Sequence, residues 1–101
     1  MAEEKTFLLI NTIPNSENTE AFQLYISRII PIFQSYGGKA VGRYKTLEQV
    51  MGDSGIKASA IFEFPSAGSI KEMIAGEEFN SLNELRKKAY KKVDLMICNS
   101  L

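Results

Sequence analysis

Two spacings of hydrophobic residues divide the chain into strand-like and helix-like segments. Compact apolar runs bounded by turn residues predict strands, whereas apolar residues three and four positions apart predict helices. Strands are expected at residues 6–12, 39–46, 58–64 and 93–99. Helices are expected at about residues 17–36 and from Ser66 or Ser69 to about residue 92, with a break at Gly76. The stripe of the first helix consists of Phe22, Ile26, Ile29, Ile30 and Phe33.

The residues at the ends of these segments support the boundaries. Ser16 or Asn18 is expected to cap the first helix, because short polar side chains accept hydrogen bonds from free backbone N–H groups. Gly37-Gly38 predicts the end of that helix, since glycine takes the left-handed conformation without strain. Ser69 precedes Glu72 by three residues, which is the spacing of a capping box at the next helix start.

The order strand, helix, strand, strand, helix, strand predicts an α+β, ferredoxin-like fold. In this plan both helices lie on one face of a four-stranded antiparallel sheet. A chain of 101 residues has the length of one domain, and no repeat, linker or low-complexity stretch divides it. We therefore expect a single domain over residues 1–101.

The first predicted strand is apolar on both sides, although an antiparallel sheet with one wet face needs only one apolar side. Phe7 and Leu9 point to one side, and Leu8 and Ile10 point to the other. Two helices cover only one face, so the second face needs another cover. We expect a homodimer joined through this sheet face, and a different partner protein is the alternative.

Composition excludes several kinds of site. Twelve basic and twelve acidic residues leave no net charge, so the chain shows no electrostatic signal for nucleic acid or an anionic membrane. With no histidine and one cysteine, Cys98, the usual zinc, copper and haem sites and histidine-assisted nucleophiles cannot be assembled. No metal or cofactor is expected, and Cys98 is expected in the core. Without a secretory segment or a membrane-spanning run, the sequence predicts a cytoplasmic protein.

One series of residues runs along nearly the whole chain: Tyr25, Pro31, Tyr36-Gly37-Gly38-Lys39, Arg43, Ile61-Phe62-Glu63-Phe64-Pro65-Ser66, Glu78-Phe79, Leu82, Arg86 and Ala89. In order and spacing it resembles the family of domains of unknown function numbered 1330 (DUF1330), in the dimeric α+β-barrel superfamily. The chain departs from that pattern after Arg43, where Tyr44-Lys45 replace frequent glycines, and in the loop beyond Glu48. The family has no settled activity. Relatives in the superfamily include cofactor-free monooxygenases, isomerases and haem enzymes, and those that depend on histidine are excluded here.

Arg43 and Glu63 are the first candidate site residues. They occupy strands joined by one hairpin, so they are expected to be neighbours in the sheet, near Val41 and Ile61. A charge on a buried strand face is costly unless it is paired. Glu63 is therefore interpreted either as a pocket carboxylate poised by a cation, which makes it a candidate catalytic base, or as half of a structural ion pair with Arg43.

Arg86 and Tyr25 are the other candidates. Arg86 shares the apolar stripe of its helix with Phe79, Leu82 and Ala89. Its planar guanidinium either binds a ligand carboxylate or phosphate, or its stem lies on the core while the charge pairs at the rim. Tyr25 is either a hydrogen-bond donor in a pocket wall or the edge of the stripe on the first helix.

The sequence favours a homodimer that binds a small, partly apolar organic molecule between sheet and helices. Tyr25, Arg43, Glu63 and Arg86 are its expected ligand-binding residues. Arg43 or Arg86 would hold an acidic group, and Glu63 would orient or deprotonate the ligand. Two alternatives remain open. One is a cofactor-independent isomerase, lyase or monooxygenase with Glu63 as base, and the other is a structural or interaction module without a pocket.

Overall fold

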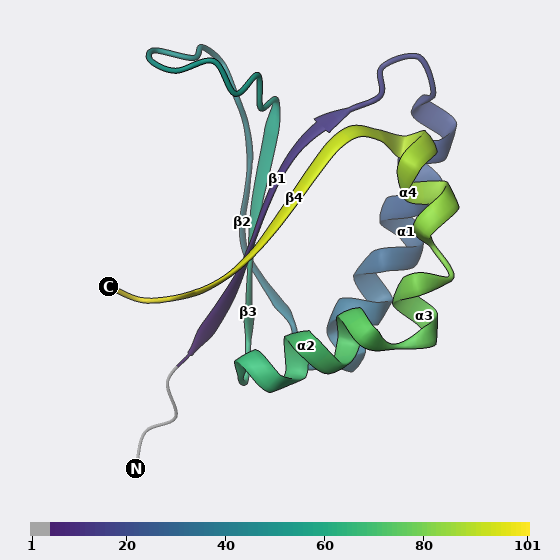
Figure 1. Cartoon of the computed structure of the whole chain (residues 1–101), viewed down its shortest axis with the longest axis vertical. Coiled ribbons are helices and arrows are strands. Elements are labelled where there is room, and N and C mark those ends of the chain that lie inside the picture. Colours follow the sequence, from purple (N-terminus) through teal and green to yellow (C-terminus); the bar gives the residue numbers. More distant parts are fainter. Residues whose placement is uncertain (1–4) are drawn as a thin grey trace.

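The computed structural model describes residues 5–101 (Figure 1). Its elements are, in chain order, β1 (Thr6–Pro14), α1 (Thr19–Ser35), β2 (Lys39–Lys45), β3 (Ala58–Phe64), α2 (Ala67–Ala75), α3 (Glu77–Asn80), α4 (Asn83–Ala89) and β4 (Tyr90–Asn99). The strands form one antiparallel sheet with the order β2-β3-β1-β4. The described helices lie on one side of this sheet (Figure 1). The expected α+β, ferredoxin-like fold is confirmed.

Cross-strand pairs determine which side chains share a face of the sheet. Leu8 of the central strand β1 lies opposite Phe62 of β3 and Ile97 of β4. Leu8 and Phe62 are buried beneath the helices, so alternate positions along each strand form a helix-facing surface. Their sequence neighbours, such as Phe7 and Leu9, point to the opposite side, which we call the outer surface.

A bulge in β2 interrupts this alternation. Ala40 lies opposite Phe62. Gly42, rather than Val41, lies opposite the next residue, Ile61. Val41 is therefore an extra residue in the strand. Because side chains alternate with a period of two, every later residue of β2 points to the face opposite to the one that regular pairing would give.

Short polar and glycine residues set the two ends of α1. The Asn18 side chain accepts a hydrogen bond from the Ala21 N–H at 3.1 Å, so Asn18 is the cap. Gly37 has a φ of +85°, and the predicted glycine end of the helix is confirmed. At Gly38 a Cβ atom would stand 2.6 Å from the ring of Phe64, so only glycine lets β2 start this close to the core.

The second helical region is more divided than the sequence predicts. Ser66 caps α2 by accepting a hydrogen bond from the Ser69 N–H at 3.1 Å. Ser69 therefore lies inside the helix, and the predicted capping box with Glu72 is wrong. The helix ends at Gly76 as expected, but two short helices, α3 and α4, follow it in place of one that runs to residue 92. Tyr90, which was expected in that helix, begins β4.

Large side chains fill the helix-facing surface near α2. The fully buried ones are Leu8, Phe64, Ile70 and Met73. Phe33 of α1 meets Phe62 and Phe64 edge-to-face, with ring centres 4.8 Å and 5.9 Å apart. Such pairs add to the stability that apolar burial supplies. This end of the molecule is a packed core.

The outer surface is also apolar, and no described helix covers it (Figure 1). Phe7, Leu9 and Ile61 are half-buried by their neighbours in the sheet, and Met96 is 39% exposed. The prediction that β1 is apolar on both sides is confirmed. Cys98, which was expected in the core, lies opposite Phe7 on the outer surface and is only partly buried.

The segment between β2 and β3, residues 46–57, projects from the sheet as an arm. Figure 1 shows it bending away from the side that carries the helices. Three of its apolar residues, Leu47, Val50 and Met51, are 96%, 88% and 89% exposed. The arm therefore carries apolar side chains into solvent on the same side as the outer surface.

Candidate functional site

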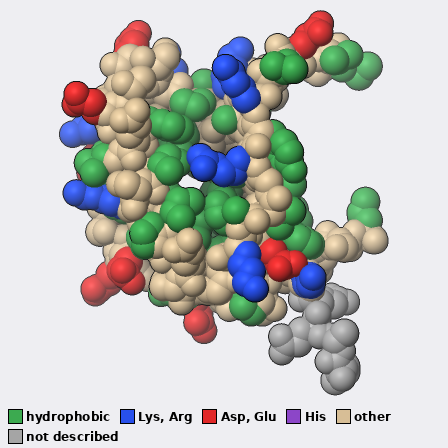
Figure 2. Space-filling model, turned by 180° about the vertical axis from the view of Figure 1, so that it is seen from behind, with side chains coloured by type: hydrophobic (Ala, Val, Ile, Leu, Met, Phe, Trp, Pro, Cys, Tyr) green, Lys and Arg blue, Asp and Glu red, His purple; other side chains and the backbone are tan. Residues whose placement is uncertain are grey.

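A cavity of about 390 Å³ lies between α1 and the helix-facing surface of the sheet. The predicted stripe of α1 forms one wall of this cavity, with the side chains Phe22, Ile26, Ile29, Ile30 and Phe33. Figure 2 shows hydrophobic side chains gathered around a hollow in the middle of one face, with basic side chains beside it. The volume falls within the range of roughly 300–1,000 Å³ that is common for ligand pockets.

Small side chains on the sheet make room for the cavity. The helix-facing positions of β3 run from Phe64 and Phe62 to Ala60 and Ala58. Thr12 of β1 lies opposite Ala58, and its hydroxyl donates a hydrogen bond to the Ala58 carbonyl at 3.3 Å. Because the side chains shrink along the strand, the space beneath α1 changes from packed core to open volume.

Two basic residues of the edge strand β2, Arg43 and Lys45, also line the cavity. They lie opposite Ala60 and Ala58, on the helix-facing side of the sheet, and both are exposed. The bulge at Val41 produces this orientation, because regular pairing would turn Arg43 to the outer surface. No described aspartate or glutamate lines the cavity. The mouth of the cavity therefore carries positive charge.

Aromatic side chains form the wall at the start of β4. The Tyr90 ring meets the rings of Phe22 and Tyr25 edge-to-face, and each pair of ring centres is 5.5 Å apart. Tyr25 is 6% exposed, and both tyrosines line the cavity. Their hydroxyl groups are polar atoms in a wall that is otherwise apolar.

Burial keeps both tyrosine hydroxyls protonated. Loss of water raises the pKa of Tyr90 to about 12; the nearby Tyr25 adds to the rise, whereas the charges of Arg43 and Arg86 oppose it. Burial likewise raises the pKa of Tyr25 above its usual 10.0, although the hydrogen bond and charge of Arg86 partly offset this effect. At neutral pH each hydroxyl is therefore available as a hydrogen-bond donor.

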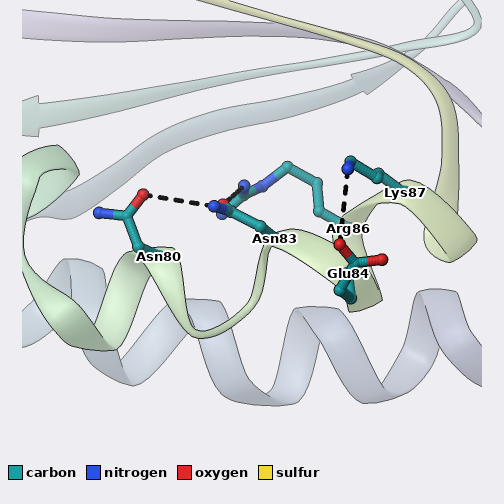
Figure 3. Close-up of polar contacts among 5 residues, drawn as sticks. All are labelled: Asn80, Asn83, Glu84, Arg86 and Lys87. Atoms are coloured by element: carbon teal, nitrogen blue, oxygen red, sulfur yellow. Dashed lines mark hydrogen bonds and ion pairs between the residues drawn. The ribbon is translucent and has the colours of Figure 1, made fainter.

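Arg86 is held by protein groups and does not line the cavity. Its Nε donates to the Tyr25 hydroxyl at 2.8 Å, and a terminal N–H donates to the Phe79 carbonyl at 3.2 Å. The other terminal group donates to the side chain of Asn83, which itself donates to Asn80 (Figure 3). The guanidinium carbon also lies 4.3 Å from the centre of the Phe79 ring. These contacts match the structural interpretation of Arg86 and place it behind Tyr25.

Glu63 and Arg43 lie on opposite surfaces of the sheet. Glu63 stands opposite Phe7 on the outer surface, where its carboxylate is 3.3 Å from Nζ of Lys5. The expected contact between Arg43 and Glu63 is therefore wrong. This difference has two physical causes. Lys39, not Arg43, lies opposite Glu63, and Arg43 lies opposite Ala60, three residues away along β3. The bulge in β2 also turns Arg43 to the helix-facing side. The structure brings Tyr25 and Arg43 to the cavity and keeps Glu63 away from it.

Lys45 and Tyr90 are among the cavity residues that sequence reasoning missed. Lys45 stands two residues after Arg43, and residues at that spacing share a face of a strand, so this signal was present. The sequence predicts a helix that continues to about residue 92, and this prediction conceals the position of Tyr90 in a strand. Its position at the first residue of β4 follows from the early end of α4 at Ala89.

Metal-ligating side chains do not gather within residues 5–101: no cluster of three or more is placed to hold an ion there. In the same part of the chain, no helix combines the length and apolar character needed to cross a membrane.

Comparison with known proteins gives one family and a set of similar folds. The model of the domain of unknown function DUF1330 matches residues 6–101. No curated protein matches the chain in sequence. A crystal structure of a protein of unknown function from Rhodopseudomonas palustris is similar, with a TM-score of 0.81 and 22% identity over 99% of this chain and 85% of that one.

Two further solved structures share the fold at lower identity. The hydroxynitrile lyase from Passiflora edulis has a TM-score of 0.74 and 10% identity, over 99% of this chain and 96% of that one. A NIPSNAP family protein of unknown function from Agrobacterium tumefaciens has a TM-score of 0.64 and 13% identity, over 99% and 91%. At these identities the likeness shows a common fold, which hosts unrelated chemistries.

Proposed function

We propose that this chain, which belongs to the DUF1330 family of domains of unknown function, binds a small, partly apolar organic molecule in the cavity beneath α1. The observation that carries the proposal is the cavity of about 390 Å³ itself. Its walls are mostly apolar, with tyrosine hydroxyls at one place and basic side chains at another. A concave apolar site with a few placed polar groups is typical of small-molecule binding.

The structure changes the roles that the sequence predicted for the polar residues. Arg43, now with Lys45, is the group that would hold an acidic part of the ligand. Tyr25 is a donor in the wall of the cavity. Arg86 acts through Tyr25 and not by direct contact with the ligand, and Glu63 is outside the site.

Binding is better supported than catalysis by a Glu63 base. A general base must lie within hydrogen-bond reach of the proton that it removes, and Glu63 is on the far side of the sheet from the cavity. The hydroxynitrile lyase from Passiflora edulis shares the fold, but no described carboxylate lines this cavity. Its similarity alone does not extend an activity to this chain.

We also propose that two copies associate in the cytoplasm through their outer surfaces. A second copy fits this place because the outer surface, with Phe7, Leu9 and Ile61, and the apolar arm of residues 46–57 lie on the same side of the sheet. A dimer would cover both, and the chain has no net charge to oppose self-association. Sedimentation velocity at micromolar concentration should give a dimer that Leu9→Asp dissociates. A monodisperse wild-type monomer would contradict this arrangement.

The cavity proposal is tested with indole, a small neutral probe, by two-dimensional ¹H–¹⁵N NMR. Indole should shift the backbone amides of Ile29 and Ala60, which line the cavity. Ala60→Leu fills the space and should abolish these shifts, whereas Ala75→Leu adds the same atoms on the exposed side of α2 and should not. Native mass spectrometry of protein from its own source should show a retained small molecule. Unshifted cavity amides together with a ligand-free natural protein would rule out the proposal.

A further inference from the structure

The Tyr25 hydroxyl can accept one hydrogen bond and donate another, and in the part of the chain that the structure describes it only accepts one. Arg86 Nε lies 2.8 Å from this oxygen, and a guanidinium can only donate, so the Tyr25 oxygen is the acceptor. The hydroxyl proton is then left for another partner. Among the described residues, no side chain or backbone group accepts it, although Tyr25 is only 6% exposed. A buried donor without an acceptor is costly unless a ligand or water supplies one.

The cavity is the place where that acceptor can stand. Tyr25 lines it, and the Tyr90 ring packs against Tyr25 at the same wall. Burial raises the pKa of both hydroxyls, so both keep their protons at neutral pH. A ligand oxygen that lacks a proton, such as a carbonyl or ether oxygen, matches these donors.

Positive charge marks a second point of the same cavity. Arg43 and Lys45 line it from β2, and no described carboxylate does. Arg43 and Tyr90 line the same cavity, so the positive charge and the tyrosine wall border one space. An anion is favoured beside two cations that have no acidic neighbour in the cavity, and a cationic ligand is disfavoured.

We propose that the ligand is a small aromatic or alicyclic carboxylate with a second, proton-accepting oxygen distant from its carboxylate. The carboxylate would lie at Arg43 and Lys45, the hydrocarbon body against the apolar stripe of α1, and the second oxygen would accept the Tyr25 proton. This inference rests on the proposed binding function of the cavity. A phosphate ester fits less well, because its charge would need several buried donors and most of this lining is apolar.

Arg86 is the positioning residue of this arrangement. Three of its nitrogen atoms bond to Tyr25, Asn83 and the Phe79 carbonyl, so the guanidinium cannot rotate away from the tyrosine. By occupying the acceptor lone pair it leaves Tyr25 a donor toward the ligand. A tyrosine that is free to rotate would bond acceptors and donors alike. Arg86 thereby selects ligands that present an acceptor.

Matched probes test the two contacts separately. The keto acid 4-acetylbenzoate has both groups, 4-isopropenylbenzoate replaces the ketone oxygen by CH₂, and 4-acetylbenzamide removes the charge. Homologues with one or two methylene groups between the ring and the carboxylate vary the distance between the carboxylate and the ketone oxygen, so that one of them can reach both contacts. Dissociation constants from NMR titration should be lowest for one member of the keto-acid series. Loss of the ketone oxygen should weaken that member about five-fold, since one buried hydrogen bond is lost, and loss of the charge should weaken it about ten-fold or more.

Variants assign each contact to its residue. Tyr25→Phe should abolish the preference for the ketone over the isopropenyl compound, and Tyr36→Phe, at the end of α1 and outside the cavity, should keep it. Arg43→Gln should lower the affinity for the carboxylate probes to near that for the uncharged amide. Arg28→Gln, on the exposed side of α1, should leave the carboxylate affinity unchanged. Arg86→Lys keeps the positive charge but loses the planar guanidinium that bonds three partners. It should reduce the preference for the ketone and leave the affinity for the carboxylate unchanged.

The outcomes separate this inference from the binding function on which it rests. Equal affinity for the keto acid, the isopropenyl acid and the amide, with indole still bound in the cavity, would overturn the ligand class and leave the binding function standing. A ketone preference that survives Tyr25→Phe would also overturn it. If neither indole nor any acid of the series shifts the backbone amides that line the cavity, both the ligand class and the binding function are ruled out.

Discussion

The two ends of the helix-facing surface are built differently, although one helix, α1, covers both. Near α2 the fully buried side chains are Leu8, Phe64, Ile70 and Met73. At the other end the sheet presents the small side chains Thr12, Ala58 and Ala60, and a cavity of about 390 Å³ remains beneath α1. Both ends are largely apolar. The size of the side chains on the sheet, more than their hydrophobicity, therefore separates core from cavity.

Polar groups follow the same division. The four fully buried side chains of the packed end carry no hydrogen-bonding oxygen or nitrogen, while the open end holds Tyr25, Tyr90 and Arg43. A packed apolar end stabilises the fold through burial. An open end contributes less to stability, and it provides the concave space in which polar groups can recognise a ligand.

Truncation at the packed end should have the largest effect on stability. Phe64→Ala removes a ring that is 1% exposed and in contact with Phe33, so the free energy of unfolding should fall by about 3–5 kcal/mol. Urea denaturation followed by circular dichroism measures it. Leu24→Ala, at a residue that is 43% exposed on α1, is the control and should cost much less. Equal losses in the two variants would contradict the assignment of Phe64 to a packed core.

Arg86→Met should be the next largest change, because Arg86 joins α1 to α3 and α4. The variant loses three hydrogen-bonded partners and the stacking on Phe79 but keeps a flexible apolar stem. We expect a loss of about 2 kcal/mol in the free energy of unfolding. Arg28→Met, on the exposed side of α1, should stay within about 0.5 kcal/mol of wild type. If Arg86→Met leaves the free energy of unfolding unchanged, Tyr25 is held in position without Arg86.

Alkaline pH should destabilise the open end through its tyrosines. The pKa of Tyr90 is about 12 in the folded chain and about 10 when unfolded, so the unfolded chain releases this proton first. The stability that Tyr90 contributes is therefore present below about pH 10 and is lost as pH rises toward about 12. Solvent at the cavity mouth weakens this effect, so Tyr90→Phe should reduce the alkaline loss in the free energy of unfolding by about 1 kcal/mol. Urea titrations at a series of pH values measure it. An identical alkaline loss in wild type and variant would contradict the assignment.

Filling the cavity should change binding far more than stability. Ala60→Leu places apolar atoms where the cavity now is, so the free energy of unfolding should change by less than about 1 kcal/mol in either direction. Binding of 4-acetylbenzoate or its best homologue should be lost in the same variant. A destabilised variant that still binds would show that the open end is not the site.

Glu63→Gln should have the smallest effect. Its ion pair with Lys5 is on the outer surface, where the Lys5 side chain is 71% exposed, and such pairs contribute about 0–1 kcal/mol. Probe affinity should be unchanged, because Glu63 is separated from the cavity by the sheet. A several-fold change in the affinity for 4-acetylbenzoate would place Glu63 back in the site.

The order of elements is predictable from the sequence because it depends on local spacing. The stripe of α1 and the run from Ala58 to Phe64 mark their elements without reference to the rest of the chain. The glycine pair at residues 37 and 38 likewise ends α1 as expected. The boundary at Tyr90 was missed because its strand conformation depends on pairing with β1, which is a contact distant in sequence.

The candidate site was only partly predictable for a similar reason. Tyr25 follows from its place beside the α1 stripe, and it does line the cavity. The side of the sheet on which Arg43 lies depends on one unpaired residue, and no local pattern announces a bulge. The contacts of Arg86 could not be inferred from its spacing, because Tyr25 comes from a helix 61 positions away in the chain.

The extra residue at Val41 decides on which side of the sheet the charge of the edge strand lies. Deletion of Val41 would leave Arg43 and Lys45 where they are, because both would still lie opposite Ala60 and Ala58. Even pairing of the strand at its present length, with Val41 opposite Ile61, would instead turn both cationic groups to the opposite side. The hollow would then be electrically neutral and the exterior charged. One step in the pairing of an edge strand would thus act on the proposed ligand choice and the proposed self-association together, with no exchange of amino acid types.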